Sequence, residues 1–413
     1  MHERIKVRNF GPVGLGGTDN DGWIEIAKVT LFCGPQGSGK SCITKLISLL
    51  TWLEKSAYRD PELKIDNVTF MQALEWQNIA NYIAADTEIA YQGDLLRFSY
   101  AKGTVSAELV FADDQSYVVP KISYMPAERN FASIVRSADR VEGLPHPLVD
   151  MQVEFNRAKR FFASGFRLPA NGFKFRFDND PWIVNGDDAD ANMTRLDVAS
   201  SGLQSMVPML LVSEYLEGHL ATEQDARRST GIFYDPGTAE KKERIEAYVR
   251  ELGANNSLTV AQKSMRLEQY FAPGRRFVNL VEEPEQNLYP ETQRAVVNAL
   301  VAIANRKPEN ILIMSTHSPY VLNQLVTAAL AASIEPSPEV EKVFPLASSV
   351  PQADMKLYEL DGKGRVVQLG TPNGLFDDQN VLNVALRDWN ELFDRLLGIK
   401  AREMRGKAVR QDA

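Results

Sequence analysis

The chain has 413 residues, of which 44% are hydrophobic and 24% charged, and its formal net charge is −8. This composition is typical of a soluble globular protein, and the length allows one large domain with insertions or two domains. No apolar run approaches the roughly 20 residues that span a bilayer, and the N-terminus carries no signal-peptide pattern. We therefore expect a cytoplasmic protein without a membrane partner. The charge excludes a general polycation for nucleic acid but leaves a local basic face open.

The elements expected in the first half alternate between strands and helices. Strands are predicted at 4–10, 23–27 and 29–33, a helix after 41, helices near 61–86, alternating strands from 88 to 124, helices again at 130–164, and a hairpin of 173–177 with 182–184. The two cysteines, Cys33 and Cys42, flank a glycine-rich segment. They are interpreted as buried packing residues in a reducing compartment, without a disulfide or metal role.

The second half is predicted to be mostly helical from 200 to 271, followed by a parallel βαβ unit. Short apolar runs at 277–281 and 311–314 are typical of buried parallel strands, and the segment 291–305 between them has helical spacing. A late hairpin joins 356–360 to 366–369, and an amphipathic helix over 380–397 is expected to end at Gly398. The sequence has no internal repeat and no heptad array long enough for a coiled-coil arm.

A phosphate-binding loop is predicted at Gly34-Pro35-Gln36-Gly37-Ser38-Gly39-Lys40-Ser41. This segment fits the eight-residue pattern without a mismatch and lies between a predicted strand and a predicted helix. The backbone N–H groups and the helix N-terminus would face one anion. Lys40 would reach the β- and γ-phosphates, and the Ser41 hydroxyl would complete a magnesium shell. The alternative is a glycine-rich turn before an ordinary helix.

Acidic residues and a histidine follow the two buried strands. Glu282 is the candidate magnesium residue and Glu283 the candidate general base, with an acidic turn after a core strand as the alternative. His317 lies where the γ-phosphate would be sensed, unless it is a structural histidine. Near the start of the helix that follows residue 200, serine and glycine would offer N–H groups to an anion, unless Ser200 is a plain N-cap.

These motifs together resemble the ATP-binding-cassette (ABC) ATPases, in the branch that contains the structural-maintenance-of-chromosomes, RecF and OLD-like ATPases. The matching elements are the first-strand residues Arg8, Asn9 and Phe10 near the nucleotide, the strand 122–126 before the Q-loop, the signature residues Ser200, Ser201, Gly202 and Gln204, the Walker B and D-loop segment 282–290, and the switch histidine in 315–319.

The resemblance covers about residues 1–370 and implies an α/β fold. An ATPase domain at 1–372 would have a mixed central sheet, an antiparallel β subdomain and helical insertions near 55–87, 130–165 and 219–272. A helical extension with a basic tail would follow at 373–413. ATP and Mg²⁺ are the implied ligands. The implied mechanism is a head-to-tail homodimer or higher homo-oligomer, in which the loop of one subunit and Ser201-Gly202 of the other enclose each ATP.

The chain departs from the resembled pattern at four places. Glu128 and Arg129 stand near the usual Q-loop glutamine, and Glu128 is the candidate metal residue there. Cys42 replaces the second Ser/Thr after the loop lysine. Glu282 stands where aspartate is commoner, and Tyr289 replaces the D-loop aspartate.

The preferred interpretation is the ATPase sensor or scaffold subunit of a bacterial antiphage defence complex, as in Septu- and PARIS-type assemblies. No nuclease constellation is evident, and the sequence after Pro319 is too short for the Toprim domain of OLD proteins. A separate nuclease or toxin would then be the effector. The alternatives are a RecF-like repair ATPase that binds DNA and a nucleotide switch that does not hydrolyse.

Two segments would suit nucleic acid as a partner. Basic and aromatic residues interleave over 155–162, with further cations at Arg167, Lys174 and Arg176. The tail at 400–410 is basic. The alternative is that the aromatic side chains belong to the core and the cations are solvated.

Overall fold

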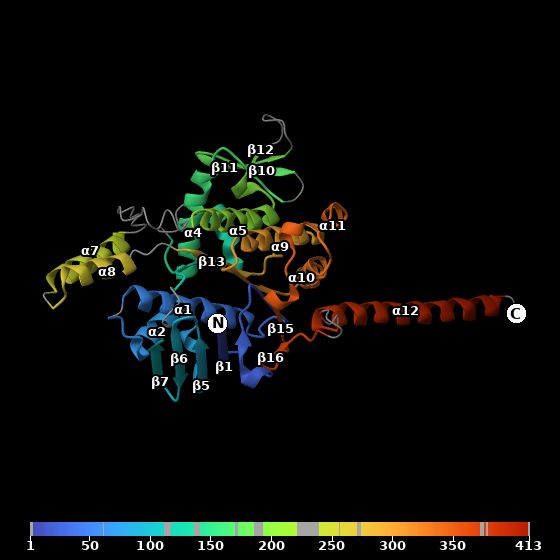
Figure 1. Ribbon diagram of the computed structural model, residues 1–413. Coiled ribbons are helices and arrows are strands. Elements are labelled where there is room, and N and C mark those ends of the chain that lie inside the picture. Colours follow the sequence, from blue (N-terminus) through green and yellow to red (C-terminus); the bar gives the residue numbers. More distant parts are fainter. Residues whose placement is uncertain are drawn as a thin grey trace.

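The computed structural model describes residues 3–60, 62–110, 117–135, 141–169, 172–185, 193–220, 239–255, 257–270, 274–371, 376 and 379–411. These residues form three sheets with helices between and around them, as Figure 1 shows. The predicted α/β class with a mixed central sheet, a separate antiparallel sheet and several helices is confirmed. The acidic stretch Asp187-Asp188-Ala189-Asp190, which its sequence favours as a solvated loop over a metal site, lies outside the described residues.

The central sheet carries the strands that lead to the predicted site. Its order is β2 (Gly16–Gly17), β16 (Arg365–Gln368), β15 (Met355–Leu360), β4 (Val29–Cys33), β14 (Ile311–Thr316), β13 (Arg276–Glu282) and β8 (Pro120–Met125). All neighbours are parallel except the hairpin β15–β16. Every residue of β4 and β13 is buried, which explains their continuous apolar runs. With α9 (Pro290–Asn305), β13 and β14 form the predicted βαβ unit.

An antiparallel sheet lies on one side of the central sheet, with α1 (Lys40–Arg59) between them (Figure 1). Its order is β3 (Ile24–Glu25), β1 (Arg4–Phe10), β5 (Ile83–Gln92), β6 (Leu96–Ala101) and β7 (Thr104–Leu109). The prediction of helix through residue 86 is wrong at its end. The helix α2 (Asn67–Trp76) is followed by a 3-10 turn and then by β5, which pairs with β1 along its length. Tertiary pairing overrides the short helical spacing of 79–83.

The opposite side of the central sheet is covered by α4 (His146–Phe161), α5 (Ser201–Gly218), α9 and α10 (Pro319–Ala332). A small antiparallel sheet packs beyond them, in the order β12 (Met193–Arg195), β11 (Asp180–Asn185), β10 (Phe173–Asp178) and β9 (Phe166–Arg167). The predicted hairpin is β10–β11. Short helices α3 (Phe131–Ile134) and α11 (Pro338–Val343) complete this side.

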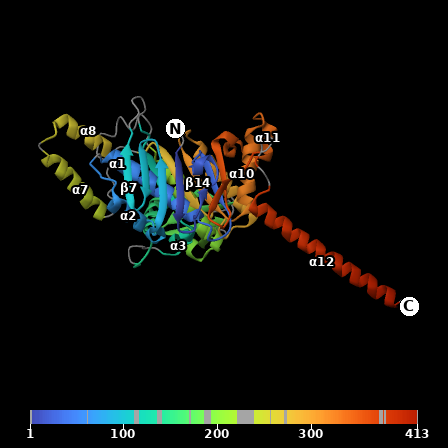
Figure 2. The ribbon, with the colours of Figure 1, turned by 90° about the horizontal axis from the view of Figure 1, so that it is seen from below.

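Two helical elements leave the body on opposite sides. The pair α7 (Ala239–Ala254) and α8 (Val260–Tyr270) projects on one side and α12 (Val381–Gln411) on the other (Figures 1 and 2). The prediction that the last helix ends at Gly398 is wrong, because α12 continues to Gln411. One glycine lowers helix stability by only about 1 kcal/mol, and good helix formers follow it. None of the described helices is apolar and long enough to cross a bilayer.

Candidate functional site: the phosphate loop and its neighbours

The segment between β4 and α1 has the backbone of a loop that wraps around an anion. Its glycines Gly34, Gly37 and Gly39 have φ angles of 144°, 72° and 101°, which side-chain-bearing residues rarely adopt. A Cβ on Gly34 would lie 2.3 Å from the carbonyl oxygen of Leu360, and one on Gly39 would lie 2.6 Å from Cγ2 of Val13. Glycine is therefore required at both ends of the loop.

Lys40, the first residue of α1, points back over this loop. Its Nζ donates hydrogen bonds to the carbonyls of Gly34 (2.9 Å) and Pro35 (2.8 Å) and lies 3.3 Å from Nδ1 of His317. Burial lowers the pKa of Lys40 to about 8, although the carboxylate of Glu283 opposes this shift. A phosphate would replace the carbonyls with charged acceptors and stabilise the ammonium form.

The remaining loop residues divide into buried and exposed groups. Pro35, Gln36 and Gly37 are exposed, as is Ser41 at the start of α1. The Ser38 hydroxyl is buried and has no hydrogen-bond partner in the described structure. Such orphaned polar atoms are rare, and an anion oxygen at the loop would satisfy this one. Cys42 is buried, and burial raises the pKa of its thiol to about 11, so it packs as an uncharged thiol.

His317 connects Lys40 to the candidate base. Its Nε2 lies 3.5 Å from Oε1 of Glu283. Because the Lys40 ammonium can only donate to Nδ1, a neutral ring carries its proton on Nε2, facing Glu283. Burial and the nearby charge of Lys40 lower the pKa of His317, which keeps the ring neutral at pH 7. Lys40, His317 and Glu283 thus form one line of contacts at the end of the central sheet.

The three carboxylates after β13 have different surroundings. Glu282 is buried and accepts from the Tyr124 hydroxyl (2.5 Å) and the main-chain N–H of Ala127 (3.3 Å). Glu283 has a φ of +43° and a partly exposed side chain that faces the loop. Glu285 accepts from the Thr316 hydroxyl (2.8 Å) and the His317 N–H (2.7 Å), so it holds the turn that carries His317.

Sequence reasoning did not assign roles to Glu285 or Tyr124. For Glu285 the available signal was the spacing of carboxylates in the run 282–285. For Tyr124 the available signal was a phenolic hydroxyl on a predicted strand that lies beside the acidic turn. Both residues hold predicted site residues in place.

The predicted metal residues do not by themselves form a cation cage. In the described ranges no group of three or more His, Cys, Asp or Glu side chains is placed to hold a metal ion. Glu128 is exposed in a 3-10 turn, Ala127–Asn130, next to buried Arg129. A hydroxyl and carboxylates are oxygen donors of the type that Mg²⁺ prefers. Mg²⁺ usually takes one or two protein carboxylates plus phosphate oxygens and water, so Ser41 and Glu282 fit that ion.

Arg129 stands near the position of the usual Q-loop glutamine, and its side chain makes hydrogen bonds inside the protein. Its side chain is fully buried and donates to main-chain carbonyls: Glu282 (2.6 Å), Glu283 (2.6 Å) and Ser205 (3.1 Å). The guanidinium therefore joins the acidic turn to α5. Its N–H groups are engaged by these carbonyls.

The signature-like segment lies at the N-terminus of α5. Ser200 and Ser201 are exposed, and the Ser200 side chain makes no cap hydrogen bond, so the plain N-cap interpretation is not supported. Gly202 packs against the turn after β13, where an added Cβ would lie 2.7 Å from the Asn287 carbonyl oxygen. The Gln204 amide bonds to the carbonyl of Asp197 (2.9 Å) and is nearly buried, so it shapes this turn from within.

The first-strand residues Arg8, Asn9 and Phe10 make their side-chain contacts with the segment 82–88. Arg8 pairs with Glu88 at 3.6 Å, and the Asn9 amide with Asp86 at 2.9 Å. Phe10 is fully buried against Tyr82. The contact with Gly39 comes from Val13 in the turn after β1, a turn closed by Phe10–Val13 main-chain bonds.

The fold and site define a strand–loop–helix phosphate-loop unit in a mixed sheet. The turn that carries the histidine follows β14, which is next to β4, and the turn that carries the carboxylates follows β13, which is next to β14. No protein-family model matches the sequence, and no curated protein matches it. Solved structures do show similarity. The head domain of the SMC protein from Thermotoga maritima has 11% identity and a TM-score of 0.37, over 89% of this chain and 99% of that one.

Two further structures are similar at the same level. The Smc head domain of Pyrococcus furiosus with an extended coiled coil, bound to the C-terminal domain of ScpA, has 10% identity and a TM-score of 0.38, over 95% and 99% of the two chains. A dimeric ATP-binding cassette bound to ADP and Pi has 11% identity and a TM-score of 0.24, over 88% and 96%. With TM-scores this low, these similarities support no inference about activity or partners.

Proposed function

We propose that this chain is an ABC-type ATPase that binds ATP with Mg²⁺ and hydrolyses it when two copies close head to tail. The observation that carries the proposal is the line of contacts from Lys40 through His317 to Glu283. These contacts bring a lysine ammonium, an imidazole and a carboxylate together at one end of the sheet, beside the glycine loop. Phosphoryl transfer needs this combination of charge stabilisation and water positioning.

Each residue has a role that follows from its surroundings. Lys40 would exchange the carbonyls of Gly34 and Pro35 for phosphate oxygens, and Ser38 would give its unpaired hydroxyl to the same anion. Glu283 would orient the attacking water and accept its proton, with its carboxylate held by Nε2–H of His317. Ser41 and Glu282 would hold Mg²⁺, which neutralises phosphate charge when bound.

Head-to-tail closure is supported by the surface around the signature-like segment. Val198 and Tyr289 are 72% and 74% exposed, beside the exposed Ser200 and Ser201. Apolar side chains this exposed next to an open helix N-terminus suit a face that a second nucleotide site covers. The site on a single chain would therefore be completed by another copy.

For the biological role, we favour a sensor or scaffold that controls a separate nuclease or toxin, as in the OLD-like Septu and PARIS assemblies. The segment 155–162, in which basic and aromatic residues interleave, gives limited support to direct DNA binding. Phe155 is fully buried, Lys159 lies over its ring at 4.8 Å, and Arg157 pairs with Glu154 at 3.3 Å. Phe155, Arg157 and Lys159 are therefore engaged in contacts within the protein, whereas Arg160, Phe161, Arg167 and Arg176 are exposed. The RecF-like alternative keeps these exposed side chains as its support.

The test of the ATPase proposal is a Glu283→Gln variant. We expect it to bind ATP normally, to lose turnover by roughly 100-fold or more, and to accumulate as an ATP-dependent dimer. Light scattering with and without ATP measures the dimer, and Glu291→Gln, an exposed carboxylate on α9, is the matched control. Wild-type turnover in Glu283→Gln would contradict the assigned base, and absent turnover in the wild type would favour a nucleotide switch.

The effector proposal has its own test. Co-purification at fixed stoichiometry with the product of an adjacent nuclease or toxin gene is expected. ATPase activity that rises with single-stranded DNA, with a steep dependence on salt, would instead support the repair alternative.

A further inference from the structure

Helix α5, which begins at the signature-like residues Ser201 and Gly202, has a buried proline in its interior, Pro208. Proline has no N–H, so it cannot donate the hydrogen bond that an α-helix makes from residue 208 to the carbonyl of Gln204. A buried carbonyl without a donor is unfavourable, because it loses its contact with water and gains no partner. The carbonyl of Gln204 therefore needs a donor from outside α5.

Ser133 on α3 supplies this donor. Its hydroxyl donates to the Gln204 carbonyl at 2.7 Å, and the serine is only 6% exposed. The short helix that carries Ser133 is held in turn by α4, because the side-chain amide of Gln152 donates to the carbonyl of Val135 at 3.0 Å. A buried hydroxyl on a fixed support thus takes the place of the missing N–H.

The next carbonyl of α5 also receives a donor from the same segment of the chain. Nε of Arg129 donates to the carbonyl of Ser205 at 3.1 Å, and its other nitrogens donate to the two carbonyls of the acidic turn. Both α5 carbonyls lie in the turn just before Pro208, where a proline weakens a helix. Residues 127–134 therefore hold the acidic turn and the start of α5 together.

The first turns of α5 depend on these outside donors more than those of an uninterrupted helix would. One hydrogen bond fewer joins the residues before Pro208 to the residues after it, and helices bend most readily at such a point. Ser201 and Gly202 lie at the N-terminal end of this weakened stretch. Their placement relative to the rest of the subunit therefore depends on the bond from Ser133.

We propose that Ser133 is a positioning residue. Its hydroxyl replaces the hydrogen bond that Pro208 cannot donate and fixes the first turns of α5, so that Ser201 and Gly202 face the nucleotide of the partner subunit in one orientation. Only this last step rests on the proposed function. The hydrogen bond itself belongs to the single chain and needs no nucleotide.

A pair of substitutions tests whether the hydroxyl and the proline are linked. Ser133→Ala removes the donor, and Pro208→Ala returns an N–H that can donate to Gln204 from within the helix. In nucleotide-free protein we expect Ser133→Ala to raise amide hydrogen exchange over residues 205–212 about tenfold. In the Pro208→Ala background the same change should have an effect of less than about twofold. A merely structural role for Ser133 would give equal effects in both backgrounds.

A second buried serine provides the matched control. The Ser348 hydroxyl also donates to a helix carbonyl, that of Asn298 on α9, at 3.0 Å, and Ser348 is 3% exposed. Ala302, four residues further along α9, has an N–H for that carbonyl, so the carbonyl keeps a donor when the serine hydroxyl is removed. Ser348→Ala should therefore change amide exchange in α9 by less than about twofold.

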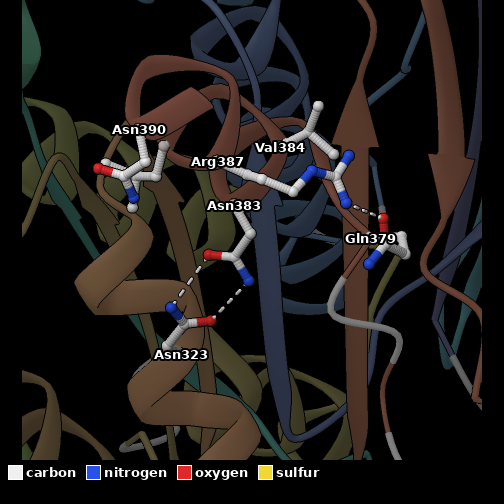
Figure 3. A pocket seen from close by; sticks show the side chains of 7 residues that line it. Asn323, Gln379, Asn383, Val384, Arg387 and Asn390 are labelled. Atoms are coloured by element: carbon white, nitrogen blue, oxygen red, sulfur yellow. Dashed lines mark hydrogen bonds between the residues drawn. The ribbon is translucent and has the colours of Figure 1, made fainter. Parts of the chain in front are cut away.

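The base of α12 is an internal reference for the exchange measurement. The amides of Asn383 and Asn323 on α10 bond to each other in both directions at 3.1 Å (Figure 3). The main-chain N–H of Val381 donates to the carboxylate of Glu359 on β15 at 2.8 Å. Groups outside the helix hold this start as well, but no proline interrupts α12, so its exchange should be the same in every variant.

The ATP-dependent dimer tests the positioning role. In the Glu283→Gln background, Ser133→Ala should raise the dimer dissociation constant about tenfold, measured by light scattering. ATP affinity should change by less than about threefold, because the phosphate loop is untouched. Adding Pro208→Ala should return the dissociation constant to within about twofold of the parent value. A Glu283→Gln parent that forms no ATP-dependent dimer would contradict the proposed function, whereas the exchange comparison would still decide the role of Ser133.

Three results would overturn the proposal: exchange over residues 205–212 that Ser133→Ala leaves unchanged, equal effects of Ser133→Ala in the two backgrounds, or an unchanged dimer dissociation constant in a variant whose exchange has risen. If Ser133→Ala alone does not fold, recovery of the folded protein on adding Pro208→Ala supports the proposal. A double variant that also fails to fold overturns it.

Discussion

Arg129 donates a 2.6 Å hydrogen bond to the main-chain carbonyl of Glu283. The same guanidinium bonds to Ser205 on α5, the helix that begins at the signature-like serines. In the proposed head-to-tail dimer the N-terminus of α5 would serve the partner's nucleotide, whereas Glu283 would serve its own. One buried side chain would then connect the two nucleotide sites through a single subunit.

The first prediction concerns this connection. Arg129→Lys keeps the charge but loses the planar fork that reaches both Glu282 and Glu283 carbonyls. We expect kcat to fall roughly tenfold or more, with ATP affinity changed by less than about threefold, because the phosphate loop is untouched. Steady-state kinetics with a direct ATP-binding measurement checks this. Equal changes in affinity and turnover would indicate a merely structural role.

The second prediction concerns His317. Because its pKa is lowered by burial and by Lys40, the ring is neutral at pH 7 and becomes protonated only below the ordinary histidine range near about 6.5. Protonation would remove the acceptor for Lys40 and place two cations side by side. Turnover should therefore fall on the acid side, and this decline should be absent in His317→Gln, whose rate we expect to be roughly 100-fold lower. An unchanged acid limb in the variant would assign the titration elsewhere.

The third prediction uses two glycines of the same helix. Gly202→Ala would place a Cβ 2.7 Å from the Asn287 carbonyl oxygen, whereas at Gly218 an added Cβ meets no atom within 4 Å. We expect Gly202→Ala to weaken the ATP-dependent dimer and to destabilise the fold by about 1–3 kcal/mol. Gly218→Ala should leave both unchanged or slightly improved. Light scattering and thermal unfolding compare the pair, and equal effects of the two substitutions would refute this account of Gly202.

The fourth prediction concerns Glu54, a fully buried carboxyl on α1. Its Oε1 accepts from the N–H groups of Leu95 (2.6 Å) and Leu96 (2.8 Å). Burial, reinforced by the nearby charge of Glu3, raises the pKa of Glu54 to about 7. Between its ordinary value and about 7 the folded protein keeps a proton that the unfolded chain releases. The stability contributed by Glu54 is thus complete at low pH and is lost as pH rises through about 7.

Glu54→Gln keeps both acceptor bonds and cannot ionise. We expect urea unfolding to show that the wild type loses free energy of unfolding between about pH 5 and about pH 8, by on the order of 3 kcal/mol from this group. Glu54→Gln should lose less over the same range and be the more stable protein at the higher pH. Glu75→Gln, exposed on α2, is the control. The same pH slope in Glu54→Gln and wild type would contradict the prediction.

The sequence was sufficient for elements with strong local patterns. The phosphate loop, the buried strands β4, β13 and β14 and the β10–β11 hairpin all lie where the pattern predicts them, because glycine spacing, apolar runs and period-two alternation are local signals. The placement of Glu283 and His317 near Lys40 also followed, since adjacent parallel strands end at one edge of a sheet.

The remainder depends on contacts between residues distant in sequence. Arg129 donates to carbonyls 153 and 154 positions away in the sequence. The sequence around Arg129 therefore does not indicate that its side chain is buried, nor which residue replaces the Q-loop glutamine. The start of β5 at Ile83 is set by pairing with Phe10 of β1. The continuation of α12 past Gly398 reflects the weak effect of a single glycine in a helix of good formers.

The anchoring of α12 at Glu359 has a mechanical consequence. Glu359 accepts from the first N–H of α12, and its own backbone is paired with Cys33, the residue directly before the phosphate loop. The first turn of α12 is therefore anchored on the strand next to the one that leads into the phosphate loop. A displacement of that strand by a fraction of an ångström would become a larger displacement at the far end of the 31-residue helix α12. Strain at the loop would thus change the direction in which α12 leaves the body.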